Sequence, residues 1–297
     1  MTELNFVVIG AQKSGTTTLH EILKGHPQIA LPADKEAPYF NLPSTSKAGW
    51  EKLVAEQIST RAAGRLVGKC SPQYLATPGV AEKVHALFPQ ACVIAILREP
   101  VDRTLSHYRM CSRRAQTDLS LEESVDAWLR AEALNEARAL PMADDTEAAC
   151  CVVWSEYGRQ LQSWIDLFGY NHVHVLYLSD LETRPEEVIA ELLCRIGADP
   201  SWQSDKIGQT FFKGSTRTRM SVFRQLKKVK PVVALWSWSI KHAPARLKYR
   251  FQQWNEAGGL EEEGRQSVDA AIRRRLASHF ASDLQLLRAQ GFQPPWG

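Results

Sequence analysis

A short apolar segment that runs into a glycine-bearing turn and then into a helical pattern opens this chain and limits the folds available to it. Residues 6–9 are apolar and mostly β-branched, which is typical of a buried strand. After a turn that begins at Gly10, residues 17–24 carry apolar side chains at helical spacing. Gly25 is expected to cap that helix and Pro27 to stop it. The chain therefore begins as strand, loop and helix.

The same alternation recurs along the chain. Strands that alternate with helices predict a mostly parallel sheet that is covered by helices on both faces. A length of 297 residues suits one large domain of this class better than two small ones, so we predict a single α/β domain over residues 1–297. Further strands are expected at residues 66–69, 92–97 and 173–178, and further helices at 81–88, 100–108 and 185–196.

Two segments stand apart from this alternation. Residues 111–150 are polar and are predicted to form a helical cap or insertion. Residues 224–258 combine lysines with tryptophans such as Trp236 and Trp238, and two interpretations are open for them. The favoured one is an amphipathic helix that packs on the domain and leaves a basic face in water. The other is an interfacial surface for peripheral membrane contact or for a lipid-like acceptor.

Charge and hydropathy exclude several classes of protein. The net charge is only +3 and the basic residues are scattered, which argues against a nucleic-acid partner and fits a small anionic ligand. No apolar run approaches the roughly 18 residues that a membrane-spanning helix needs. The N-terminus also lacks the layout of a secretory signal. We therefore expect a cytoplasmic protein, complete as written, without a transmembrane segment.

Six cysteines are distributed along the chain, and none forms a C-x-x-C pair. In a chain of this size we expect free thiols in a reducing compartment. Only His172 and His174 lie close enough in sequence to share a metal ion, and no further ligand is evident near them. We therefore predict no metal site.

The turn from Gly10 to Thr17 has the position and the composition of a phosphate-binding loop. Between a strand and a helix, backbone N–H groups and the positive end of the helix dipole face an anion, and Thr16 and Thr17 add hydroxyl donors. The Walker A pattern has lysine directly after its second glycine, whereas here that place holds Thr16 and the lysine comes earlier, as Lys13. The plainer interpretation is a glycine turn that only begins a helix.

A second candidate anion site follows the strand predicted at residues 92–97. Arg98 leaves this apolar strand, and a guanidinium there offers a bidentate grip on a phosphate. Ser106 adds a hydroxyl donor from the next helix. The alternative is a surface ion pair of Arg98 with Glu99 or Asp102.

The loop from Gly10 to Thr17 resembles the 5′-phosphosulfate loop of the PAPS-dependent sulfotransferases, and Arg98 with Ser106 resembles the pair that grips the 3′-phosphate in that family. PAPS is 3′-phosphoadenosine-5′-phosphosulfate, and PAP is its desulfated product. The resemblance implies a P-loop-like α/β fold and PAPS as sulfuryl donor, without a metal. It also implies that the cofactor is bound by Lys13, Ser14, Gly15, Thr16, Thr17, Arg98 and Ser106.

Residues 35–40 resemble the segment of the heparan-sulfate and carbohydrate branch in which a glutamate before paired aromatic residues is the catalytic base. The matching residue is Glu36, and the family often has histidine where Pro38 stands here. A positioned carboxylate contributes roughly 10²–10⁴-fold to proton removal from a hydroxyl. The resemblance therefore implies that Glu36 takes the proton of the acceptor. Without it, Glu36 reads as an ordinary surface glutamate.

Two further segments complete the resemblance. Residues 68–74 are similar to the Lys-[Ser/Thr]-Pro-x-Tyr element, with Cys70 as an extra residue, so that Lys69 joins Lys13 as a catalytic residue that stabilises charge on the leaving phosphate. A surface lysine at the end of a strand is the alternative for Lys69. Residues 211–217 resemble the loop that closes over the cofactor, which implies binding by Lys213, Gly214 and Ser215.

Taken together, these segments predict in-line transfer of a sulfuryl group from PAPS to a hydroxyl of a carbohydrate, a lipid or another small molecule, with release of PAP. Two other functions stay open at this point. A small-molecule kinase on a related loop requires Mg²⁺ and carboxylates that hold it. A non-catalytic protein that binds PAP or another nucleotide leaves Glu36 and Lys69 without a purpose.

Overall fold

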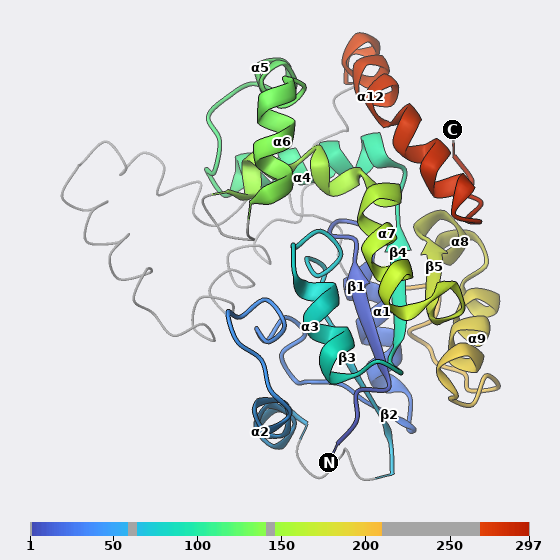
Figure 1. The fold of residues 1–297 in the computed structure, drawn as a ribbon. Helices are drawn as coiled ribbons and strands as arrows, with labels where there is room; N and C mark the ends of the chain where they lie inside the picture. The colour runs from blue at the N-terminus through green and yellow to red at the C-terminus, as the bar shows by residue number, and fades with distance from the viewer. Residues whose placement is uncertain (1, 59–63, 141–145, 210–267, 297) are drawn as a thin grey trace, which may run out of the picture.

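A computed structural model describes residues 2–58, 64–140, 146–209 and 268–296 of the chain. At its centre lies a five-stranded sheet in the order β2-β3-β1-β4-β5, in which all neighbouring strands are parallel (Figure 1). This confirms the predicted parallel sheet and adds β2, a two-residue strand too short to show a period in the sequence. The strands are β1 (Phe6–Gly10), β2 (Ile29–Ala30), β3 (Leu66–Cys70), β4 (Cys92–Leu97) and β5 (Val173–Tyr177).

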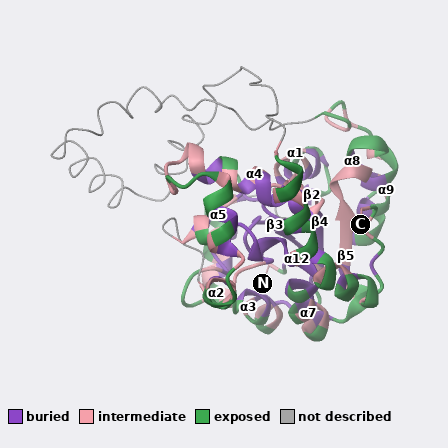
Figure 2. Cartoon of the chain, turned by 90° about the horizontal axis from the view of Figure 1, so that it is seen from above, coloured by how far each residue is buried: buried purple, intermediate pink, exposed green. Residues whose placement is uncertain are grey.

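Side chains of the strands alternate between two hydrophobic clusters, one on each face of the sheet. On β1, Phe6 and Val8 join one cluster, while Val7 and Ile9 join the other. The predicted covering of both faces is therefore confirmed, and Figure 2 shows the buried residues on the strands and on the inner sides of the helices around them. One face is covered by α1 (Thr16–Gly25), α8 (Leu178–Thr183) and α9 (Pro185–Ile196), the other by α2 (Lys47–Gln57), α3 (Val80–Leu87), α7 (Tyr157–Phe168) and α12 (Ala270–Ala289).

The end of α1 differs in detail from the prediction. Gly25 is still helical, and the cap is His26, whose backbone is extended at φ −72° and ψ 131°. The proline ring excludes the preceding residue from the helical region, so His26 cannot continue the helix. The helix therefore ends at Gly25, and its cap lies one residue later than predicted. The ring of His26 then stabilises the turn, because its Nδ1 accepts a hydrogen bond from the amide of Gln28 at 3.1 Å.

The polar segment 111–150 is helical in its described part, as predicted. A third hydrophobic cluster joins these helices to α12, with Leu105, Val125 and Phe280 among its buried members. A capping box of Ser120 and Glu123 fixes the start of one of them. In Figure 1 these helices lie beyond the ends of the central strands. They are α4 (Pro100–Arg113), α5 (Leu121–Trp128) and α6 (Ala131–Ala139), followed by the short 3₁₀ turns η2 (Glu147–Cys150) and η3 (Val153–Ser155).

A buried carboxylate joins three of these helices at the start of α7. Glu156, which is 4% exposed, accepts hydrogen bonds from Arg138 of α6 at 2.8 and 2.9 Å, and from Arg159 of α7 at 2.7 Å. His279 of α12 lies 3.0 Å from the same carboxylate. Burial on its own raises the pKa of this carboxyl, but the histidine and the two arginines outweigh it and lower the pKa to about 2.

Glu156→Gln is expected to lower the free energy of unfolding at pH 7 by about 2–3 kcal/mol, the value of a lost charged hydrogen-bond network. The folded pKa lies below the ordinary value of 4.5, so this stability is fully present above about pH 4.5 and is lost as the pH falls towards 2. Urea unfolding of the wild type and of Glu156→Gln at pH 7 and at pH 3 measures the difference in their free energy of unfolding, which is expected to be smaller at pH 3. A gap between the two proteins that stays constant with pH contradicts the prediction.

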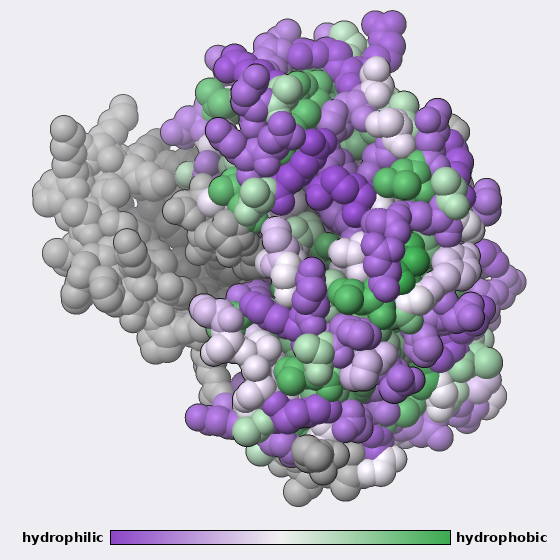
Figure 3. Space-filling model, viewed as in Figure 1, coloured by the Kyte–Doolittle hydropathy of each residue, from purple (hydrophilic) through white to green (hydrophobic). Residues whose placement is uncertain are grey.

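None of the helices within the described ranges is both long and apolar enough to span a membrane. On the face drawn in Figure 3, hydrophilic residues separate the apolar ones into small groups. The segment 224–258 lies outside the described residues, so both interpretations of it stay predictions.

Candidate functional site

The parallel sheet brings the segments singled out in the sequence to one edge. In a parallel sheet the carboxyl ends of all strands point the same way, and ligands of open α/β folds bind beyond those ends. The loop at residues 11–15 follows β1, and Lys35 with Glu36 follows β2. Arg98 follows β4 directly, and β4 is the neighbour of β1 in the sheet. Segments that are far apart in sequence thus meet at the edge where an anion is expected.

The loop after β1 presents the start of α1 to a ligand. Its first residue is tied to the neighbouring strand, because the amide of Ala11 donates to the carbonyl of Ile96 at 2.7 Å. Lys13 and Gly15 both have left-handed backbone, with φ values of 70° and 90°. The left-handed backbone at Gly15 favours glycine, and a Cβ there would also come within 2.8 Å of the end of the Leu178 side chain, which would have to move.

No side chain caps the first turn of α1, and this turn contains no acidic residue. The first N–H groups of a helix lack partners within the helix and carry the positive end of its dipole. The side chain of Ser14 is fully buried in the same loop. These features fit a phosphate at this position, as the loop predicts.

Lys35 completes this end of α1, although the resemblance of residues 35–40 to a known family implied a role only for Glu36. Its ammonium donates to the hydroxyls of Thr16 at 3.2 Å and Thr17 at 3.1 Å, and lies 3.3 Å from the carboxylate of Glu36. The side chain is only 6% exposed. The predicted base and the predicted phosphate loop are therefore linked through one buried cation.

Lys69 lies behind this group. Its position in β3, opposite Val7 of β1, buries it completely, and burial lowers the pKa of its ammonium to about 8. The ammonium donates to the carbonyl oxygens of Lys35 at 2.8 Å and Cys70 at 3.1 Å. The predicted role was direct stabilisation of the leaving phosphate. In this structure the ammonium supports the backbone that carries Lys35 and Glu36, and the catalytic role of Lys69 stays a prediction.

Arg98 is half-buried at the end of β4, and Ser106 is half-buried in α4. The neighbouring carboxylates have other partners: Glu99 caps α4 by accepting from the amide of Asp102 at 2.6 Å, and Asp102 pairs with Arg273 at 2.9 Å. Over the described ranges, no carboxylate pairs with the Arg98 guanidinium. The surface ion pair that we considered for Arg98 is therefore not formed here.

The backbone of Arg98 is fixed by Tyr157, which is fully buried at the start of α7. Burial raises the pKa of this phenol to about 12, so it remains a donor at neutral pH. The phenol donates to the carbonyl oxygen of Arg98 at 2.9 Å and lies beside Ser14 of the loop. One side chain thus connects the two predicted anion sites.

The sequence profile described as "Sulfotransferase domain" matches residues 4–278 of the chain. The chain belongs to the sulfotransferase family. This makes the protein a member of a family of transferases, as the resemblance of its loops predicted. The match covers the phosphate loop, Glu36 and Arg98, which the fold brings to one edge of the sheet.

Two curated relatives and one solved structure are similar to this sulfotransferase. The membrane-associated sulfotransferase kil1 of Dictyostelium discoideum is 39% identical over 104 residues, which are 35% of this chain and 22% of kil1. The human bifunctional heparan sulfate N-deacetylase/N-sulfotransferase 2 is 24% identical over 201 residues, 66% of this chain and 22% of the relative. The chain thus spans about a fifth of both relatives. A sulfotransferase structure from Alicyclobacillus acidocaldarius has the same fold, with a TM-score of 0.64 at 21% identity over 97% of this chain and 96% of that one.

A buried network holds the phosphate loop of the sulfotransferase from behind. Arg103 of α4 donates to the backbone carbonyl of Gln12 at 3.5 Å, and the side chain of Gln12 donates to Glu147 at 2.8 Å. Burial on its own raises the pKa of Glu147, but His107, Arg114 and Gln12 outweigh it and hold the pKa well below its usual range. The loop is therefore anchored through both the backbone and the side chain of one residue.

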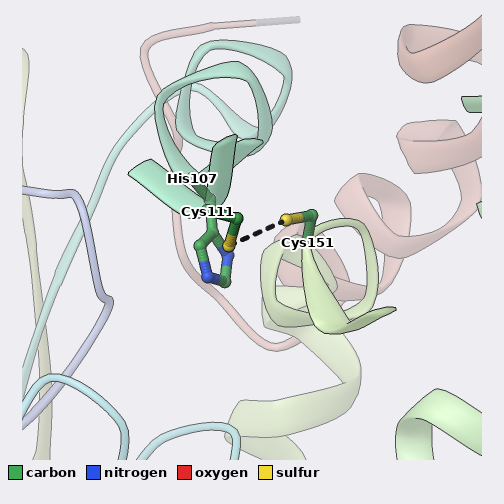
Figure 4. A group of neighbouring side chains, drawn as sticks. All are labelled: His107, Cys111 and Cys151. Carbon is green, nitrogen blue, oxygen red and sulfur yellow. Dashed lines mark hydrogen bonds between the residues drawn. The ribbon is translucent and has the colours of Figure 1, made fainter. Parts of the chain in front are cut away.

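The fold also assembles a histidine and two cysteines that the sequence did not connect. His107, Cys111 and Cys151 are buried, and their ligand atoms lie within 4.8 Å of one another (Figure 4). The Arg103 guanidinium donates to Nδ1 of His107 at 3.2 Å, while Nε2 lies 3.5 Å from the carboxylate of Glu147.

The two thiols of this cluster differ in acidity. The hydrogen bond with Cys151, over a sulfur–sulfur distance of 3.9 Å, and the adjacent His107 lower the pKa of Cys111 to about 6 against the effect of burial. Burial raises the pKa of Cys151 well above its usual value. All six cysteines are free thiols, as expected from the sequence. Cys111 is therefore the more acidic thiol of the pair.

Part of the predicted site lies outside the described residues. Lys213, Gly214 and Ser215, assigned to the loop that closes over the cofactor, fall in the range 210–267. Their contribution to the site stays a prediction, as do the cytoplasmic location and the single-domain organisation.

Proposed function

We propose that this sulfotransferase transfers a sulfuryl group from PAPS to a hydroxyl of a carbohydrate, lipid or other small-molecule acceptor, and releases PAP. The observation that supports this most is that the candidate binding and catalytic groups lie together at the carboxyl ends of the strands. An uncapped helix start with threonine hydroxyls, a guanidinium without a carboxylate partner within the described residues, and a carboxylate all lie at that edge. These groups fit a ligand with a phosphate at each end and a hydroxyl acceptor beside it.

PAPS supplies the sulfuryl group, and its bond to the phosphate breaks as the acceptor oxygen bonds to sulfur. In this proposal, the amides at the start of α1 and the hydroxyls of Thr16 and Thr17 bind the 5′-phosphate, while Arg98 and Ser106 bind the 3′-phosphate. Holding both ends orients the reacting group. Ser14, Gly15 and Lys13 shape the loop, and Lys13 is further assigned to charge stabilisation.

Glu36 is the proposed base, and it takes the proton that the acceptor hydroxyl loses. Its carboxylate lies next to Lys35 at the start of α1, which is where the 5′ end of the cofactor is expected. Lys69 is proposed to contribute by supporting the backbone of this segment. The carbohydrate as acceptor class is favoured by the similarity to a relative named for heparan sulfate.

The first experiment is a calorimetric titration of the purified protein with PAP in excess EDTA, with 5′-AMP in EDTA, and with ATP both in EDTA and in Mg²⁺ without EDTA, as comparisons. We expect PAP to bind much more tightly than 5′-AMP, because only PAP carries the 3′-phosphate that Arg98 is proposed to grip. Equal affinity for PAP and 5′-AMP, or binding of ATP that requires Mg²⁺, contradicts the proposal and favours the kinase.

A further inference from the structure

Lys35 uses all three donors of its ammonium at the start of α1. The partners are the hydroxyl oxygens of Thr16 and Thr17 and the carboxylate of Glu36, at 3.2, 3.1 and 3.3 Å. A lysine ammonium donates three hydrogen bonds and accepts none. Both threonine hydroxyls therefore act as acceptors towards Lys35.

Because both hydroxyls accept from Lys35, each can still donate one hydrogen bond. A hydroxyl that accepts from Lys35 keeps its own proton for a different acceptor. Within the described residues, neither Thr16 nor Thr17 donates a side-chain hydrogen bond to another group. Both protons are therefore available to an anion at the uncapped first turn of α1.

The ammonium itself is held in place by its surroundings. The carbonyl of Lys35 accepts from the buried Lys69 at 2.8 Å, and the amide of Glu36 donates to the carboxylate of Asp34 at 3.1 Å. With Lys35 only 6% exposed, its charge is weakly screened by water. The fixed backbone of Lys35 and Glu36 thus holds the buried Lys35 ammonium against the hydroxyls of Thr16 and Thr17.

We propose that Lys35 is a positioning residue for the 5′-phosphate of the cofactor, and that it acts by turning the Thr16 and Thr17 hydroxyls into oriented donors. Its bond to Glu36 keeps the base beside the same group. This inference rests on the proposed function, because it concerns the end of the ligand that α1 is proposed to bind. Arg98, at the other end, has no part in it.

Mononucleotides that carry one phosphate each separate the two ends in a test. Affinities for 5′-AMP and 3′-AMP are measured by calorimetry for wild type, Lys35→Met, Thr17→Val and the double variant, with thermal unfolding as a check on folding. The matched control is Lys47→Met, a lysine at the surface of α2. We expect Lys35→Met to weaken 5′-AMP binding by about 10-fold or more, as for a lost charged hydrogen bond, and to change 3′-AMP binding less than about twofold.

The double variant tests whether Lys35 acts through the threonines. Residues that work as one unit give non-additive effects, so Thr17→Val in the Lys35→Met background is expected to cost much less than in wild type. Fully additive losses, or equal losses of 5′-AMP and 3′-AMP affinity, overturn the proposal. If Lys35→Met does not fold, Lys35→Gln replaces it with the same expected pattern.

The outcome also separates this inference from the proposed function. A wild-type protein that binds neither 5′-AMP nor PAP contradicts the proposed function. A wild-type protein that binds PAP tightly, together with a Lys35→Met variant of unchanged 5′-AMP affinity, contradicts the role of Lys35 alone.

Discussion

Glu36→Gln is expected to lower turnover by about 10²–10⁴-fold while PAP affinity stays within about threefold of wild type. The glutamine keeps the size of the side chain and still accepts from Lys35 through its carbonyl oxygen, so the loop that follows β2 is expected to keep its place. What it loses is the ability to take a proton. The effect is therefore expected in turnover rather than in nucleotide binding.

The measurement combines steady-state sulfuryl transfer from PAPS to an acceptor found by screening with calorimetric titration of PAP. The control is Glu182→Gln, an exposed glutamate of α8 on the surface of the domain. Undiminished turnover in Glu36→Gln removes this residue from the role of base. A parallel loss of PAP affinity instead assigns it to nucleotide binding.

Arg98→Ala is expected to weaken PAP binding by about 10- to 150-fold, the range that a lost hydrogen bond to a charged group gives. The affinity for 5′-AMP is expected to stay unchanged, because that ligand lacks the 3′-phosphate. The substitution keeps the backbone carbonyl that accepts from Tyr157, so the end of β4 retains its anchor. The preference of the protein for PAP over 5′-AMP is then expected to shrink by the same factor.

Titration of both nucleotides against wild type, Arg98→Ala and Arg109→Ala checks this. Arg109 lies on the exposed side of α4 and serves as the matched control for loss of one positive charge near the same helix. Unchanged PAP affinity in Arg98→Ala rejects the 3′-phosphate site. A loss that is equal for PAP and 5′-AMP places Arg98 at the other end of the ligand.

Helices that the sequence did not single out are held by distant contacts. The C-terminal α12 is rich in arginine and buries only Leu276, Phe280 and Leu287, so its own pattern is weak. Its place depends on packing against α7 and α4 and on the contact of His279 with Glu156. Such a helix is stabilised by its partners rather than by its own amphipathic face.

The sequence by itself determined the alternation of strands and helices, the phosphate loop and the candidate Arg98, because periodicity and turn chemistry depend on residues that are close along the chain. Through the resemblance of residues 35–40 to a known family, it also made Glu36 a candidate. It also led to the family, which the matched profile confirms. Only the tertiary structure decided which groups the two lysines contact. Lys69 is buried in β3 and its ammonium donates to the carbonyl of Lys35, while the segment after β2 places the Lys35 ammonium against Thr16 and Thr17. These contacts join a strand, a helix and a loop that are far apart in sequence, and no local pattern predicts which of their residues will meet.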